Sequence, residues 1–212
     1  MIIIYLLFAI GLATGSAQAV AADAHEEMTE AVTGGNVAMV NTLLAKGIDV
    51  DSTDRAGTTL LMAAATSGKL DVAKALIAAK AKINARNQYG ESALMMAAIR
   101  GHREMVEYLL AHEAEVNLPG WTPLMFAVVK GHAGIARMLL DKGANVNAAS
   151  ENGTTALMLA AKEGNLDSVL LLLERGAAPN LRNLAGATAL ALALEGGRKN
   201  VVNALVRAGA EQ

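Results

Sequence analysis

The chain contains no cysteine and few aromatic residues. Without thiols it cannot form disulfide bonds, bind a metal through thiolates or use a cysteine nucleophile. Aromatic residues make up 3% of the sequence, whereas hydrophobic residues make up 53%. The interior must therefore be built from Ala, Leu, Val and Met, a composition that suits short helices packed closely together.

The sequence also lacks an excess of charge of either sign. Its 18 Lys and Arg residues against 20 Asp and Glu residues give a net charge of −2. A protein that binds nucleic acid through its phosphates usually carries a basic surplus. We therefore expect no nucleic-acid partner.

Residues 1–22 differ in character from the rest of the chain. An almost unbroken apolar run over residues 2–13 is followed by the small-residue triplet Ala17-Gln18-Ala19. Because a membrane-spanning helix needs about 20 apolar residues, the pattern predicts a signal peptide over residues 1–19 instead. The mature chain would begin near Val20 and work in the periplasm or as a secreted protein. No Lys or Arg precedes the apolar run, so an uncleaved membrane anchor stays open as the alternative.

The strongest positive signal is an internal repeat. Its first marker is a glycine that recurs with spacings of 33, 30, 33 and 33 residues, at Gly57, Gly90, Gly120, Gly153 and Gly186. A second glycine follows each of these by eleven residues. Such a period is typical of stacked repeats, each of which buries its apolar face against its neighbours.

Each unit contains the signals for two helices. A Thr or Ser such as Thr59 opens a short apolar segment and is expected to cap its first helix, and Pro123 takes the first helical position in one unit. The second glycine ends that helix. Apolar residues at helical spacing then predict a second helix over residues 71–79, 104–111, 135–141, 167–174 and 200–207. The fold class is therefore an all-α repeat solenoid of helix-turn-helix units with hairpin-like loops between them.

These motifs resemble the ankyrin repeat family, in register, from about residue 24 to the C-terminus. The best match combines Gly120-Trp121-Thr122-Pro123-Leu124, Gly131-His132, Leu139-Leu140 and Gly143-Ala144-Asn145-Val146-Asn147. The resemblance implies a capping repeat over residues 20–52 and five further repeats over residues 53–212, the last of them a C-terminal cap. The recurring Thr-x-Leu-Met also resembles bacterial members of the family, and together with the predicted signal peptide it implies the exported, periplasmic type.

Methionine replaces the His that the family carries in its first helix, at Met62, Met95, Met125 and Met158. One interpretation, which we favour, is that these side chains fill the core. The other is that they form a soft, adaptable strip on a binding surface.

A second departure from the pattern is a shortened loop. In three units, an Asn near the end of the repeat pattern precedes the next first-marker glycine by six residues, as at Asn84–Gly90. At Asn117–Gly120 this spacing is three residues. The deletion is either neutral or leaves a notch that exposes the neighbouring Trp121 as a binding anchor. Lys80 and Glu113 also stand where other units have glycine, which predicts strained or frayed helix ends.

The resemblance implies a non-enzymatic scaffold that binds a partner protein, as a monomer, on a concave surface of loop tips and first helices. The matching positions carry polar or aromatic side chains, namely Arg55, Tyr89, Glu91, Arg100, Trp121, Lys130, Glu151, Lys162 and Glu163. We expect no catalytic residues, no metal site and no cofactor, since His102 and His132 occupy motif positions and no paired ligand spacing occurs. The alternatives are a hydrolase or small-ligand binder that uses the groove, and a membrane-anchored display of the array.

Overall fold

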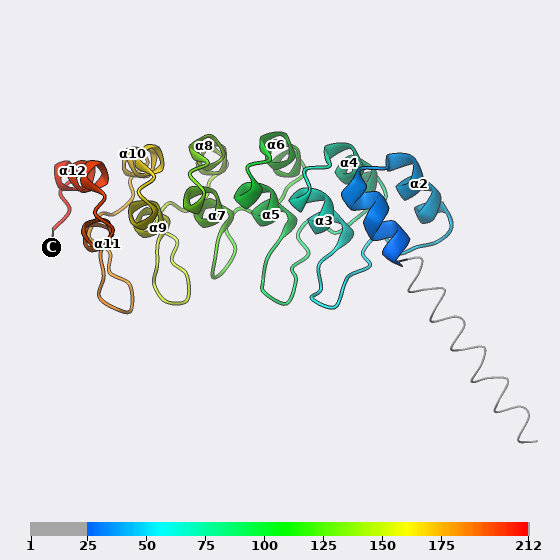
Figure 1. The fold of residues 1–212 in the computed structure, drawn as a ribbon, viewed down its shortest axis with the longest axis horizontal. Helices are drawn as coiled ribbons and strands as arrows, with labels where there is room; N and C mark the ends of the chain where they lie inside the picture. The colour runs from blue at the N-terminus through cyan, green and yellow to red at the C-terminus, as the bar shows by residue number, and fades with distance from the viewer. Residues whose placement is uncertain (1–24, 212) are drawn as a thin grey trace, which may run out of the picture. The chain divides into compact units, whose positions relative to one another are not determined.

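The computed structural model describes residues 25–211, and these residues are helices joined by turns and loops (Figure 1). The predicted signal peptide lies outside the described residues. The chain divides into two compact units, residues 1–82 and 83–212. In the described part, no helix has the length and apolar character needed to cross a membrane.

The described part of the first unit contains four helices. A helix over residues 25–34 is followed by α2 (Val37–Ala45), α3 (Leu60–Thr66) and α4 (Leu70–Ala78), and α2 and α3 both pack against α4. Apolar side chains from all four helices are buried between them, among them Val32, Leu43, Leu61 and Leu76.

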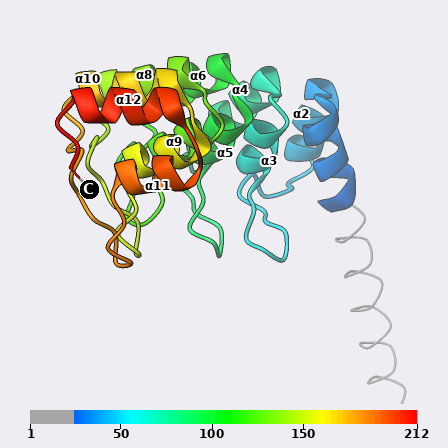
Figure 2. The ribbon, with the colours of Figure 1, turned by 60° about the vertical axis from the view of Figure 1, so that its left-hand side comes forward.

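The second unit arranges its helices in two layers, as Figures 1 and 2 show. The first layer holds α5 (Ala93–Arg100), α7 (Pro123–Val129), α9 (Ala156–Glu163) and α11 (Ala189–Glu195). The second holds α6 (Arg103–Ala111), α8 (Ala133–Asp141), α10 (Leu166–Glu174) and α12 (Lys199–Arg207). Helices of each layer pack side by side in chain order, and the long loops project beyond the first layer. This arrangement confirms the predicted helical solenoid.

The first-layer helices and α3 begin at the predicted caps. The hydroxyls of Thr59, Ser92, Thr122, Thr155 and Thr188 are buried and accept the backbone N–H three residues on, at 3.1–3.4 Å. Each bond satisfies a donor that the helix itself leaves unpaired. The second helices begin one or two residues earlier than predicted, because each starts directly after the single residue that follows the turn glycine.

The four methionines are core residues. Met62, Met95, Met125 and Met158 are each at most 1% exposed. The interpretation as core is therefore confirmed, and the interpretation as an exposed binding strip is wrong.

Neighbouring repeats of the second unit are joined by a ladder of asparagines, at Asn84, Asn117, Asn147 and Asn180. The Asn117 side chain, for example, donates to the Gly143 carbonyl at 2.9 Å and accepts from the Asn145 N–H at 2.8 Å. Each of the other three makes the same pair of bonds to the next repeat. An amide can do so because it carries both a donor and an acceptor.

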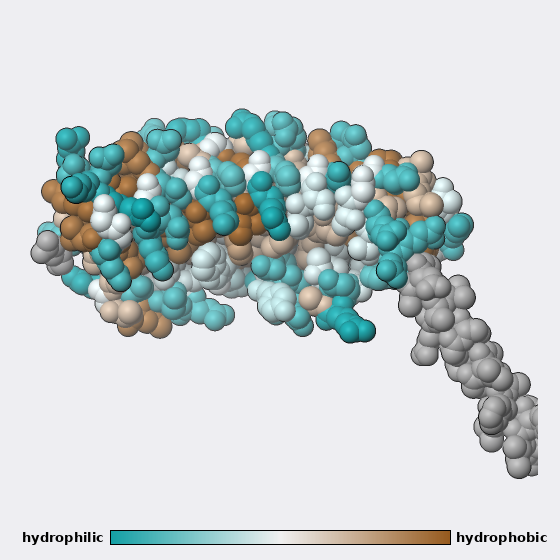
Figure 3. All heavy atoms as spheres, viewed as in Figure 1, coloured by the Kyte–Doolittle hydropathy of each residue, from teal (hydrophilic) through white to brown (hydrophobic). Residues whose placement is uncertain are grey.

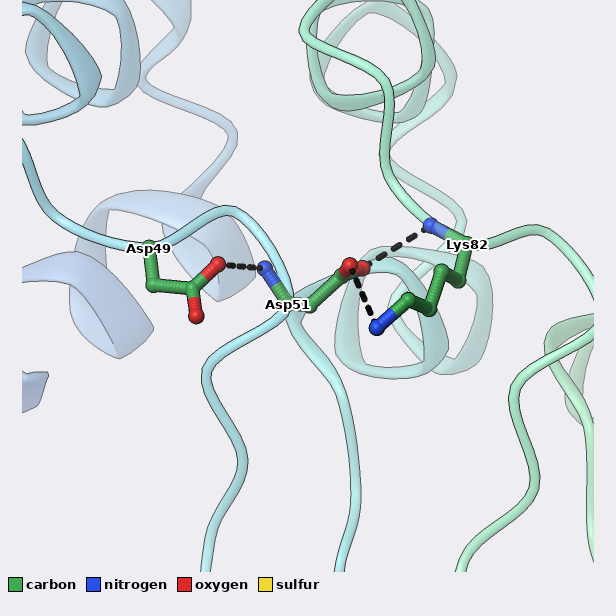
Figure 4. Close-up of polar contacts among 3 residues, drawn as sticks. All are labelled: Asp49, Asp51 and Lys82. Atoms are coloured by element: carbon green, nitrogen blue, oxygen red, sulfur yellow. Dashed lines mark hydrogen bonds and ion pairs between the residues drawn. The ribbon is translucent and has the colours of Figure 1, made fainter.

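The first unit uses an aspartate for the same purpose (Figure 4). Asp51 accepts from the Lys82 N–H at 2.8 Å, and its second oxygen lies 3.4 Å from the Lys82 Nζ. Asp49 accepts from the Asp51 N–H at 2.9 Å and fixes the turn. An ionised carboxylate cannot donate, so the ion pair with Lys82 takes the place of the amide's donor bond.

Lys80 and Glu113 are in the left-handed region, with φ of 72° and 63°. This conformation is unfavourable for a residue with a Cβ. The prediction of strain at these two helix ends is therefore confirmed.

Candidate functional site

The shortened loop of the second unit lies at a groove, which Pro119, Gly120 and Trp121 help to line. On either side of it stand full-length loops, residues 86–91 and 150–153, and the groove of about 710 Å³ opens between them. Most of its lining comes from the loops, whereas Met95 and Phe126 come from α5 and α7. We call this groove the notch.

Hydrogen bonds draw the loops together on each side of the notch. Arg86 donates through Nε to the Gly90 carbonyl at 2.8 Å and through Nη2 to the Pro119 carbonyl at 3.3 Å. On the other side, the Leu184 N–H donates to the Asn152 carbonyl at 2.9 Å. Within the described residues, no hydrogen bond joins residues 118–121 to residues 150–153. The notch therefore lies where one pair of linked loops ends and the next pair begins.

Two aromatic side chains of the notch are exposed to solvent. Tyr89 is 71% exposed and Trp121 is 43% exposed. Trp121 packs against Phe126 with ring centroids 5.3 Å apart, so one part of the indole is supported while the rest stays accessible. Large aromatic side chains that are only partly covered offer apolar area that a partner can bury.

The notch also carries carboxylates. Asn87 holds Glu91 in place by donating through Nδ2 to the Glu91 Oε2 at 2.8 Å, while the Glu91 N–H donates to the Asn87 Oδ1 at 2.9 Å. Glu151 is exposed and has no ion pair within the described residues. The charged side chains of the lining are therefore the guanidinium of Arg86 and the carboxylates of Glu91 and Glu151.

Four of the nine residues predicted to bind a partner line the notch, namely Tyr89, Glu91, Trp121 and Glu151. Four others, Arg100, Lys130, Lys162 and Glu163, are exposed at the C-terminal ends of α5, α7 and α9 and lie outside it.

The ninth predicted residue, Arg55, is an exposed loop residue of the first unit. It follows Asp54, which organises that loop. Desolvation raises the pKa of the Asp54 carboxyl, but the N–H groups of Thr58 and Ala56 donate to it at 2.8 Å and outweigh this effect. The pKa of Asp54 is therefore below its usual range, and the carboxylate stays charged to hold the turn.

Sequence reasoning missed three residues that shape the notch: Arg86, Asn87 and Phe126. A signal for Arg86 was present, because an arginine recurs at the same place in a later repeat. There Arg182 donates to the Gly186 carbonyl at 2.9 Å, just as Arg86 donates to Gly90.

The notch offers aromatic faces, carboxylates and amide groups, a mixture suited to binding a polypeptide. In the described part of the chain, no group of three or more His, Asp or Glu side chains is placed to hold a metal ion. The ring of His132 packs instead over Gly101, 2.7 Å from where a Cβ on that glycine would stand.

Comparisons with known proteins agree with the geometry. A family model of three consecutive ankyrin repeats matches residues 17–87, 61–150, 112–183 and 144–212. The crystal structure of the human ASB11 ankyrin repeat domain is similar to this chain, with 27% sequence identity and a TM-score of 0.80. The similarity covers 87% of this chain and 84% of that one. No curated protein sequence matches this chain.

Proposed function

Because the chain belongs to the ankyrin repeat family, we propose that it is a scaffold that binds a partner protein through the notch and the surface around it. Ankyrin repeats generally serve as protein–protein interaction scaffolds and generally are not enzymes. The observation that carries the proposal is the position of Tyr89 and Trp121, which are both exposed and line one groove.

The basic and acidic side chains outside the notch extend the same proposal. Arg100, Lys130, Lys162 and Glu163 lie at the ends of consecutive first-layer helices. A binding surface with an aromatic centre and a polar rim is typical of non-obligate protein interfaces. We assign these four side chains to the rim and Tyr89 and Trp121 to the centre.

Replacing either aromatic residue of the notch by alanine is expected to weaken partner binding about tenfold or more, because buried Trp and Tyr side chains carry much of an interface's affinity. The partner would first be isolated with the full chain as bait and then purified. Its affinity for wild type, Tyr89→Ala and Trp121→Ala would be measured by calorimetry.

The control is Glu107→Ala, which removes an exposed side chain from α6 in the second layer. It should leave the affinity unchanged. If both aromatic variants bind the partner as tightly as wild type, the notch is not the binding site.

We also propose that the chain is exported in a bacterium and works as a monomer in the periplasm. The apolar run and the Ala17-Gln18-Ala19 triplet support this proposal. The partner would then be another exported protein, such as an enzyme that the scaffold protects or inhibits.

Export predicts a defined mature protein. On expression of the full sequence in a Gram-negative host, we expect the periplasmic fraction to contain a chain that starts near Val20, as read by N-terminal sequencing or intact mass. An intact chain with Met1, recovered from the membrane fraction, would instead establish the anchored alternative.

A further inference from the structure

We propose that the notch accepts a cationic side chain, an arginine or lysine, from an extended segment of the partner. This inference rests on the proposed scaffold function and names the chemistry that the notch recognises. It follows from three features of the lining: its aromatic faces, its balance of charge and its size.

The aromatic faces provide the first argument. Trp121 and Tyr89 both line the notch and both are exposed, and the Trp121 ring is held by its packing against Phe126. A cation placed over an aromatic face within about 6 Å of the ring centre is attracted by the ring quadrupole, and Trp is the strongest such partner. Arginine and lysine also have apolar stems that can pack on the rings while the charged end reaches a carboxylate.

The balance of charge provides the second argument. The Nε and Nη2 groups of Arg86 are engaged by the Gly90 and Pro119 carbonyls, so this guanidinium serves to hold the loops. Neither Glu91 nor Glu151 forms an ion pair with it within the described residues. The one guanidinium and two carboxylates give the lining a net charge of −1, and neither carboxylate has an ion-pair partner in the described part of the chain.

Of the two carboxylates, Glu91 is the one that other residues hold in a fixed position. Asn87 fixes its Oε2 and its backbone N–H, and its Oε1 has no hydrogen bond within the described residues. Glu91 is also half-buried, which lessens the screening of its charge by solvent. A preorganised acceptor with an unused oxygen favours a cationic donor.

This charge decides among possible occupants. An acidic side chain would be repelled by Glu91 and Glu151. A large apolar side chain would cover the carboxylates and desolvate them without supplying a counter-charge, which is costly. A cationic side chain covers the aromatic rings and supplies the counter-charge at the same time.

The size of the notch agrees with a side chain presented by a backbone segment. Its volume of about 710 Å³ exceeds that of one amino-acid side chain, and grooves of about 300–1,000 Å³ are typical ligand sites. The notch is open between two projecting loops, so an extended segment can lie across it while one side chain enters.

Trp121 allows a direct test, because it is the only tryptophan in the chain. Short capped Gly-Ser peptides with one central Arg, Lys, Leu or Glu would be titrated into the full-length protein, with tryptophan fluorescence as the readout. We expect the fluorescence to change saturably with the Arg and Lys peptides, and these peptides should bind at least about tenfold more tightly than the Leu peptide. The Glu peptide should give no saturation. Raising the salt concentration should weaken binding of the Arg and Lys peptides.

The double variant Glu91→Gln/Glu151→Gln keeps the side-chain shapes and removes both charges. It should reduce the affinity for the Arg peptide about tenfold, whereas Glu107→Gln on α6 should not change it. The proposal is overturned if the Leu peptide binds as tightly as the Arg peptide, or if the double variant binds the Arg peptide as tightly as wild type.

The two sets of experiments distinguish failure of this proposal from failure of the proposed scaffold function. If the cationic peptides fail but Trp121→Ala still weakens partner binding, the scaffold function stands and only the occupant is wrong. If the peptides bind as expected but Trp121→Ala and Tyr89→Ala leave the affinity for the partner unchanged, the proposed binding surface is wrong. The preference of the notch for a cationic side chain then still stands.

Discussion

Met125→Ala is expected to lower the free energy of unfolding by about 2–5 kcal/mol, the usual cost of truncating a buried Met, Leu or Ile to alanine. Met125 has no solvent exposure, and its helix α7 packs between α5 and α9. The truncation would leave a cavity in the middle of the first layer. Neighbouring helices are held there by close packing and cannot collapse fully into the space.

Met125→Leu is the matched control. It keeps the volume of the side chain nearly constant, so its cost should stay below about 1.5 kcal/mol. Urea unfolding followed by far-ultraviolet circular dichroism measures both variants. Trp121 fluorescence reports on the same repeat, and agreement of the two probes tests whether the unfolding is two-state. An alanine variant with the wild-type unfolding midpoint would show that Met125 does not contribute to the core.

Met125→Leu also distinguishes the core from the proposed binding surface. Met125 does not line the notch, whereas Met95 does. We therefore expect Met125→Leu to bind the partner as tightly as wild type. Methionine occupies equivalent positions in both repeats, but only Met95 is among the residues that line the notch.

The fold could be predicted because its signals are local. A buried Thr or Ser caps α3 and each first-layer helix, and a glycine with positive φ follows each of these helices within two residues, so each signal is local. The repeat multiplies these signals in register. Stacking of the helices then follows, since no single unit can bury its apolar face alone.

Part of the site could be predicted for the same reason. The deletion between Asn117 and Gly120 is visible in the spacing, and Trp121 lies next to it. Alignment of the repeats places Tyr89, Glu91 and Glu151 in or next to the two longer loops on either side of the deletion. All three line the notch in the structure. Arg100, Lys130, Lys162 and Glu163 fall outside because a first helix separates them from the loops. An eight-residue helix such as α5 is about 12 Å long.

The contacts between repeats could not be predicted from the sequence. The bond from Arg86 to Pro119 joins residues 33 positions apart, and the Asn117 bond to Gly143 joins residues 26 apart. Such contacts depend on the distance between stacked loops, which no local rule gives. The recurring asparagine was visible as part of the motif, but its role as a two-way bridge appears only when the next repeat is in place.

Gly101→Ala is expected to cost about 2–4 kcal/mol, and the reason is also a contact between repeats. Gly101 ends α5 with φ of 77°, a conformation that costs an alanine about 1–2 kcal/mol. The rest of the cost comes from His132, whose ring lies where the new Cβ would stand, with Cε1 2.7 Å away and Nε2 2.9 Å away. The imidazole would have to swing out of its place between the two repeats.

Gly143→Ala is the matched control, because φ there is 84° and nothing lies within 4 Å of an added Cβ. It should cost only the backbone term of about 1–2 kcal/mol. In a His132→Ala background, the cost of Gly101→Ala should fall to the same level, since this substitution removes the ring with which the new Cβ would clash.

Glu113→Gly tests the backbone argument in the opposite direction. It removes the Cβ from a residue with φ of 63° and should raise the free energy of unfolding by about 0.5–1 kcal/mol.

Chemical denaturation of Gly101→Ala, Gly143→Ala, His132→Ala and the Gly101→Ala/His132→Ala double variant separates the two causes. If Gly101→Ala and Gly143→Ala cost the same, the glycine after α5 is needed for its backbone conformation alone, and the ring of His132 yields at no cost. A larger cost at Gly101 that disappears with His132→Ala shows that this glycine also admits a side chain from the next repeat. The recurring glycine then has two roles, because it ends the first helix and lets the following repeat approach closely enough to stack.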